Sequence, residues 1–295
     1  MNVTPASHAV PVTPAAPSSY PSLPEARPPL RPWARATVMV VGFAIVMLAA
    51  NSAAASLGHP VIALLVGPLV AAAVLWLYRT ATTRVERRPA TDLAPTGAAR
   101  GVLTGVAGGV ALAAVTIGVI ALLGGYQITG WGSLAGALTV IGMMCTVAVT
   151  EEVLFRGVIF RLLERRGGTW IALAVSALLF GLVHLVNPGA TIWGAVAIAI
   201  EAGLMLGAAY AVTGSLWLPI GLHLGWNVTI VAIFGTIPSG SHARDALVTA
   251  TTDGPAWLTG GGFGPEASVI AVLVCSIATA AFLGTARRRR RLVGR

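Results

Sequence analysis

A small set of polar residues within otherwise apolar sequence has the side chains needed for acid–base chemistry. The set is Glu151, Glu152, Arg156, His184, His223 and Asn227. A charged side chain near the centre of a bilayer costs about 2.5–3.5 kcal/mol on insertion scales, so such residues usually face a bundle interior or a water-filled cavity. We therefore expect this set to lie around one functional cavity.

The spacing of these residues assigns them to helix faces. Glu152 and Arg156 are four residues apart, so they can pair along one face and neutralise each other in a low dielectric. Glu151 points about 100° around the helix from Glu152, which leaves it free to act. His223 and Asn227 repeat the four-residue spacing, so both side chains can point into the same cavity.

The same set contains the groups that peptide-bond hydrolysis requires. A carboxylate beside a histidine can take a proton from water and deliver it to the leaving amine. A second histidine and an asparagine amide can donate hydrogen bonds to the tetrahedral oxyanion. Other intramembrane protease chemistries fit poorly, because the sequence has no His-Glu-x-x-His zinc motif and no aspartate in an apolar run.

The composition identifies the class of protein. Apolar residues make up 56% of the 295 positions and charged residues only 10%, against about 25% charged in a soluble domain. Eight apolar runs are compatible with the roughly 20 residues that cross about 30 Å of hydrocarbon. They are Thr37–Leu57, Val61–Tyr78, Val102–Leu123, Ser133–Leu163, Trp170–Val186, Ile192–Val212, Leu216–Ile237 and Ser268–Thr285. We predict an all-α, multi-pass transmembrane bundle of the cell membrane.

The sequence outside these runs predicts the domain organisation and the orientation. A Pro/Ala-rich disordered tail is expected at 1–36, the bundle at 37–286 and a basic tail at 287–295. Because cytoplasmic loops are enriched in cationic residues, both termini are placed inside, which leaves only Arg244 outside and Arg156 in the membrane. The inner arginines favour anionic lipid headgroups as partners. Nucleic acid is not expected, because no aromatic residues are interleaved with these arginines.

This orientation also predicts the depth of the polar residues. Counted from the inner ends of the spans at 1.5 Å per residue, Glu151 lies about 15 Å deep, His223 about 12 Å, Asn227 about 18 Å and His184 about 22 Å. The residues could meet in one cavity open to the inner side. A tilt of its helix, or an inner boundary earlier in the sequence, would then be needed to bring His184 level with the others.

Three short motifs occur in order along the central part of the chain. They are Glu-Glu-x-x-x-Arg at 151–156, Phe-x-x-x-His at 180–184 and His-x-x-x-Asn at 223–227. No single motif is specific, but the ordered set over 142–230 resembles the CPBP family of intramembrane endopeptidases. This family includes CAAX proteases and bacteriocin-processing enzymes, and is also called Abi or Rce1-like.

The resemblance implies a reaction and a role for each residue. It implies catalytic roles for Glu151, His184, His223 and Asn227 and supporting roles for Glu152 and Arg156. In the family, the first glutamate activates water together with the first histidine, and the second histidine and the asparagine form the oxyanion site. The expected activity is hydrolysis of a peptide bond near the C-terminus of a membrane-associated protein or peptide, without a cofactor. Some members act on prenylated CAAX proteins on the cytosolic side.

Other functions stay open at this point. Two histidines and two glutamates could bind zinc. A non-catalytic membrane binding or immunity protein could keep the same fold and use the cavity to hold a peptide. A proton-coupled transporter would also use buried Glu and His residues, although the sequence shows no obvious inverted repeat.

Two further features of the spans predict local structure. Glu201 lies in the middle of the sixth apolar run, where it could line the same cavity or accept a hydrogen bond from a neighbouring helix. Gly101, Gly105 and Gly109 form a stripe of small residues on the third span. Such stripes let helix backbones approach closely in membranes, so we expect a packing surface there.

Overall fold

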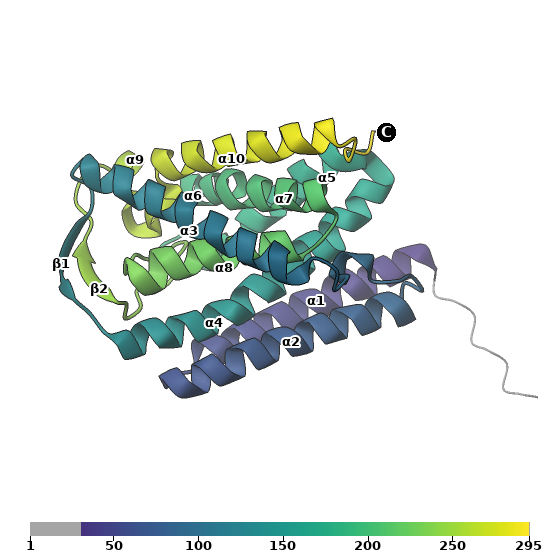
Figure 1. Cartoon of the computed structure of the whole chain (residues 1–295), viewed down its shortest axis with the longest axis horizontal. Helices are drawn as coiled ribbons and strands as arrows, with labels where there is room; N and C mark the ends of the chain where they lie inside the picture. Colours follow the sequence, from purple (N-terminus) through teal and green to yellow (C-terminus); the bar gives the residue numbers. More distant parts are fainter. Residues whose placement is uncertain (1–30, 295) are drawn as a thin grey trace, which may run out of the picture.

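The computed structural model describes residues 31–294 and has the predicted all-α architecture, a bundle of apolar helices (Figure 1). The helices are α1 (Pro32–Ala55), α2 (Pro60–Arg84), α3 (Ala98–Leu122), α4 (Leu134–Glu152), α5 (Arg161–Val183), α6 (Ile192–Ile198), α7 (Met205–Thr213), α8 (Trp217–Asn227), α9 (Ala256–Thr259) and α10 (Val269–Arg288). Three π-helical segments, Val153–Phe160, Ala199–Leu204 and Val228–Ile233, follow α4, α6 and α8. Most of the predicted disordered tail, at 1–30, and Arg295 lie outside the described residues.

Each of the eight predicted apolar runs has a helical counterpart. Within the described residues, six helical stretches are long and apolar enough to cross a membrane. The longest, Leu134–Val186, reverses direction at Gly168, where φ is 79° and ψ is 174°. Glycine alone adopts this conformation readily, so the stretch supplies two crossings. The shorter apolar helix Trp217–Ile233 corresponds to the remaining predicted run, and the protein is a multi-pass membrane protein.

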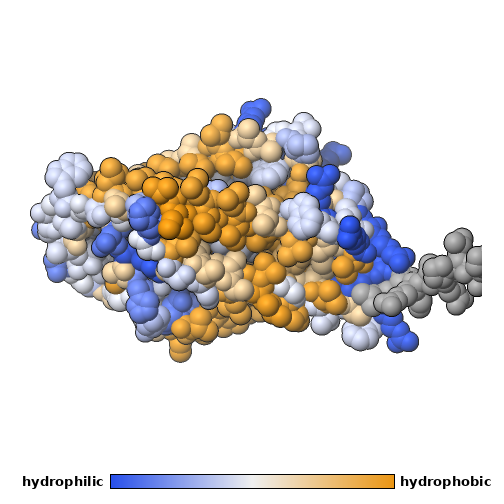
Figure 2. Space-filling model, turned by 90° about the horizontal axis from the view of Figure 1, so that it is seen from below, coloured by the Kyte–Doolittle hydropathy of each residue, from blue (hydrophilic) through white to orange (hydrophobic). Residues whose placement is uncertain are grey.

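The two ends of the bundle differ in structure and in charge. The start of α1, the last turns of α2 and α10 and the reversal at Gly168 lie at one end, which we call the basic end (Figure 1). At the other end, β1 (Gln127–Trp131) pairs antiparallel with β2 (Val248–Thr251), and we call this the hairpin end. Figure 2 shows hydrophobic surface along the middle of the molecule and hydrophilic residues toward both ends. The placement of the basic end inside the cell stays a prediction.

A buried polar network ties the basic end together. The Tyr78 hydroxyl on α2 contacts the Asp92 carboxylate, and it lies 2.7 Å from the Gly157 carbonyl oxygen. Arg161 donates to the same carbonyl at 2.7 Å and pairs with Glu86 at 2.6 Å. The network joins α2 and the loop that follows it to the π-helical segment Val153–Phe160, and so closes the bundle at this end.

The predicted glycine stripe on α3 packs directly against α8. A Cβ atom at Gly105 would lie 2.5 Å from the Leu218 carbonyl oxygen, and one at Gly109 would lie 2.2 Å from the Leu222 carbonyl oxygen. On the facing helix, a Cβ atom at Gly221 or Gly225 would meet α3 backbone atoms at 2.4 or 2.3 Å. This close backbone contact fixes α8, the helix that carries two of the predicted site residues.

We expect Gly109→Ala to destabilise the bundle, because its new methyl group would meet backbone atoms that cannot rotate away. Overpacking of this kind costs about 1–3 kcal/mol. Thermal unfolding in detergent measures the effect. Gly118→Ala on the same helix is the matched control, because a Cβ atom there meets nothing within 4 Å. Equal melting temperatures for the two variants would contradict the packing role.

Candidate active site

The Glu152–Arg156 pair is fully buried and links two parts of the bundle. Arg156 Nη1 donates to Glu152 Oε1 at 2.8 Å, and both side chains are 0% exposed, as the four-residue spacing predicts. Arg156 Nη2 donates to the carbonyl oxygens of Ala202 and Gly203 at 3.1 and 3.0 Å. These carbonyls belong to the π-helical segment Ala199–Leu204, so the guanidinium joins α4 to the sixth apolar run.

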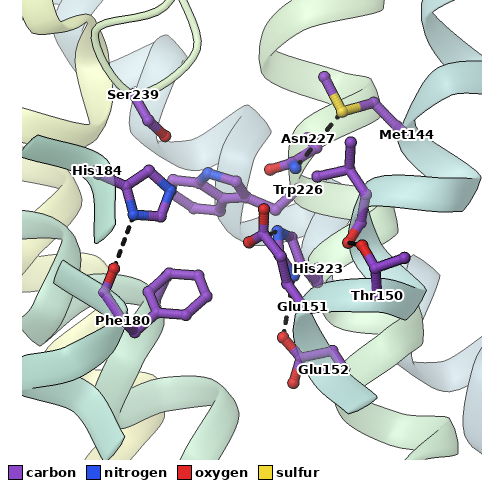
Figure 3. Close-up of polar contacts among 12 residues, drawn as sticks. Met144, Thr150, Glu151, Glu152, Phe180, His184, His223, Trp226, Asn227 and Ser239 are labelled. Atoms are coloured by element: carbon purple, nitrogen blue, oxygen red, sulfur yellow. Dashed lines mark hydrogen bonds and ion pairs between the residues drawn. The ribbon is translucent and has the colours of Figure 1, made fainter. Parts of the chain in front are cut away.

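His223 lies between the two glutamates (Figure 3). Its Nδ1 atom is 3.0 Å from Glu152 Oε1, and its Nε2 atom is 3.9 Å from Glu151 Oε2. Because Glu152 also accepts from Arg156, it is an ionised acceptor, and His223 Nδ1 donates to it. Glu152 therefore fixes the imidazole ring so that Nε2 faces Glu151. The Glu151 side chain is 12% exposed, whereas that of Glu152 is fully buried.

Asn51 on α1 contacts Glu151 and was not predicted from the sequence. Its Nδ2 atom donates to Glu151 Oε1 at 3.5 Å, and its Oδ1 atom accepts from the Thr150 hydroxyl at 2.8 Å. The Asn51 amide thus connects α1, which contains none of the three motifs, to Glu151. The one available signal was an asparagine inside an apolar run, since polar residues in such runs usually face the bundle interior.

We expect Asn51→Ala to lower kcat about tenfold with little change in KM. The loss of one hydrogen bond, about 1–1.5 kcal/mol, corresponds to this factor if the bond orients the Glu151 carboxylate. Initial rates at several substrate concentrations separate the two constants. Ser52→Ala, an exposed neighbour on the same helix, is the control. Loss of folded protein without a kcat effect would show that Asn51 is structural only.

His184 lies at the hairpin end of α5, away from the other histidine. Its Nδ1 atom is 2.7 Å from the Phe180 carbonyl oxygen, which can only accept, so Nδ1 carries the proton and Nε2 is an acceptor in the neutral ring. In Figure 3 the His184 ring is separated from the Glu151 carboxylate, on the side of the view where Ser239 lies. Within the described residues, no hydrogen bond joins His184 to Glu151. Both residues instead line one cavity.

A cavity of about 530 Å³ brings the predicted residues together. Glu151, His184, His223 and Asn227 all line it, as expected. Its lining continues to loop 238–244 at the hairpin end, through Pro238, Ser239, Ser241 and Arg244. The lining therefore extends toward the hairpin end, and not only toward the inner side that the sequence analysis expected. The depth of about 22 Å expected for His184 agrees with its position at the hairpin end of this lining.

Two further carboxylates lie beside the cavity. Glu201 lines it and is fully buried, and its carboxylate lies beside the Cys275 thiol. Glu266, which the sequence analysis missed, accepts from the Ser239 backbone N–H at 2.5 Å and from Trp226 at 3.3 Å. Burial raises the pKa of Glu266, while the hydrogen bonds from Ser239 act in the opposite direction. Glu266 thereby holds loop 238–244 against α8.

The described residues were compared with the ligand sets of zinc sites. Zinc sites in proteins require three or four closely grouped His, Cys, Asp or Glu ligands. No group of three such side chains suited to a metal ion occurs among residues 31–294. His184 forms its hydrogen bond with the Phe180 carbonyl oxygen, whereas His223 is paired with Glu152.

Comparison with known proteins finds one family. The family model described as type II CAAX prenyl endopeptidase Rce1-like matches residues 132–229. This segment contains all three motifs and all six predicted site residues, and the match confirms the resemblance. Asn51, Ser239, Arg244 and Glu266 lie outside it. Comparison with the curated proteins and with the solved structures gives no match.

Proposed function

Because residues 132–229 match the model of the Rce1-like family, we propose that this membrane protein is an intramembrane endopeptidase. It hydrolyses a peptide bond near the C-terminus of a membrane-associated protein or peptide, with water activated by Glu151. The observation that carries the proposal is the arrangement of Glu151, which faces the cavity beside His223, while buried Glu152 holds that histidine in place. Prenylated CAAX proteins are the substrates that the family description suggests.

The charges around Glu151 support its role as the base. His223 Nε2 lies 3.9 Å from Glu151 Oε2, so a proton on this nitrogen would balance the second carboxylate of the group, while Arg156 balances the first. Glu151 is the member of this group with access to the cavity. It takes a proton from a water molecule in the cavity, and the resulting hydroxide adds to the carbonyl carbon of the scissile bond.

His184 assists the proton transfer from the other side of the cavity. Its Nδ1–H group is engaged with the Phe180 carbonyl oxygen, which leaves Nε2 as an acceptor. The proton removed from water is then delivered to the nitrogen of the leaving amine, and the C–N bond breaks. In this scheme Glu151 and His184 hold the water between them, although they do not contact each other directly.

His223 and Asn227 stabilise the oxyanion that forms when hydroxide adds to the carbonyl. The His223 Nε2–H group, present when the ring carries the shared proton, donates one hydrogen bond. The Asn227 amide donates a second, and its present acceptor is only the Met144 thioether at 3.6 Å. A thioether is a weak acceptor, so the amide is available to substrate. Such donors typically contribute about 2.7–4 kcal/mol each to the rate.

Protein termini in host cells provide the test of this function. Cells that express the wild type are compared by mass spectrometry with cells that express Glu151→Gln at the same level. New C-termini that occur only with the wild type would identify both the activity and the substrate. Identical termini, with both proteins folded in the membrane, would refute the proposal and favour the non-catalytic binding or immunity role.

A further inference from the structure

Most of the arginines lie at the basic end, whereas the cavity lining extends to the hairpin end. Among the described residues, Arg244 is the only arginine on the loops of the hairpin end. Its Nη1 atom donates to the Ala55 carbonyl oxygen at the end of α1, at 3.4 Å, and its side chain lines the cavity. The single arginine that the charge distribution assigns to the outer face therefore stands at the cavity itself.

The opening of the cavity lies between α1 and α5. On α1, the lining residues Leu48 and Ala55 are exposed, and Leu48 has 62% of its surface accessible. On the other side, Val183 and Val186 at the end of α5 are 38% and 83% exposed. These residues belong to the halves of α1 and α5 nearest the hairpin end. The opening thus faces the lipid around the half of the bundle nearest the hairpin end, and it also faces loop 238–244.

The other end of the cavity is closed. Below Glu151, the pair formed by Glu152 and Arg156 is fully buried, and the Phe180 ring lies 4.7 Å from the Arg156 guanidinium carbon. Farther toward the basic end, Tyr78 and Arg161 bind the Gly157 carbonyl oxygen. A peptide approaching from the basic end would have to break this buried network before it reached Glu151.

From these observations we propose that the substrate segment enters from the extracytoplasmic face. The enzyme would then act on an exported protein or peptide held at the outer leaflet, and not on a cytosolic prenylated protein. The basic end is the cytoplasmic end by the positive-inside rule, and the cavity opens at the opposite end. The identity of the segment as a substrate rests on the proposed function, whereas the side on which the cavity opens can be measured without any activity.

Cysteine labelling measures the side of the opening. Cys145 and Cys275 are replaced by alanine, and single cysteines are introduced as His242→Cys on the exposed loop or Ala55→Cys at the opening. Thr83→Cys, exposed at the basic end of α2, is the matched control. A membrane-impermeant maleimide should label the first two in intact cells and the control only after permeabilisation. The reverse pattern would overturn the proposal.

Blocking the opening tests whether the substrate uses it. A bulky maleimide on Ala55→Cys, added from outside, should abolish the turnover detected by the comparison of termini, and the same reagent on permeabilised Thr83→Cys should not. New termini should also lie in exported segments. Turnover that persists after complete labelling of Ala55→Cys, or new termini confined to cytosolic proteins, would overturn the proposed route. External labelling without any turnover in the unlabelled wild type would instead refute the proposed function alone.

Discussion

Glu151→Gln is expected to lower the rate of peptide hydrolysis by about 10²–10⁴-fold while the protein still folds. The substitution keeps the shape of the side chain and an amide oxygen for the hydrogen bond from Asn51, but it removes the group that accepts the proton from water. General-base catalysis contributes a factor of this size. Initial rates of the purified protein, measured with a peptide that spans the cleavage site found in cells, give the effect directly.

Glu201→Gln is the matched control for this prediction. It makes the same chemical change beside the same cavity, at a carboxylate that is fully buried and has no part in the proposed steps. We expect its rate to stay within a few-fold of the wild type. Normal turnover in Glu151→Gln would exclude Glu151 as the base. An equal loss in both variants would show that the effect of Glu151→Gln is not specific to a base at position 151.

The fold could be predicted from the sequence largely because the membrane restricts the choices. Within hydrocarbon, only helices and closed barrels satisfy their backbone hydrogen bonds, so apolar runs of sufficient length had to be helices. The chain reverses between the fourth and fifth runs at Gly168, which has the positive φ that favours glycine. The antiparallel pairing of β1 with β2 was not predicted, because the two strands are short and far apart along the chain.

The site could be predicted only where its contacts are local in sequence. Glu152 and Arg156 lie one helical turn apart, so their pairing followed from spacing alone. The partners of Glu151 are His223 and Asn51, which lie 72 and 100 residues away and whose contacts depend on how the helices pack. Helix periodicity contains no such information. The family motifs do identify His223, but Asn51 lies outside the matched segment.

The side on which the cavity opens could not be predicted from depth. The depths of Glu151 and His184 measure position along each helix, and they are the same whichever end of a cavity is closed. Closure depends on loop 238–244 and on the network around Gly157, which bring together residues distant in sequence. Glu266 shows this clearly, because its contacts with Ser239 and Trp226 hold the loop beside the opening.

Arg156→Met is expected to reduce the folded yield and the thermal stability, and not only the rate. The guanidinium is completely buried, pairs with Glu152 and donates to the carbonyl oxygens of Ala202 and Gly203. Removal of one partner of a buried pair costs about 3–5 kcal/mol, because the other charge stays buried without compensation. Yield of monodisperse protein after size-exclusion chromatography and the melting temperature in detergent measure the loss.

The double variant Glu152→Gln/Arg156→Met separates the charge effect from the loss of packing. With both charges removed, no uncompensated carboxylate is left at position 152, so part of the decrease in melting temperature should be reversed. Activity should not return, because His223 has then lost the ionised acceptor that fixes its ring toward Glu151. A double variant no more stable than Arg156→Met would mean that the carbonyl hydrogen bonds, and not the ion pair, account for the stability that Arg156 provides.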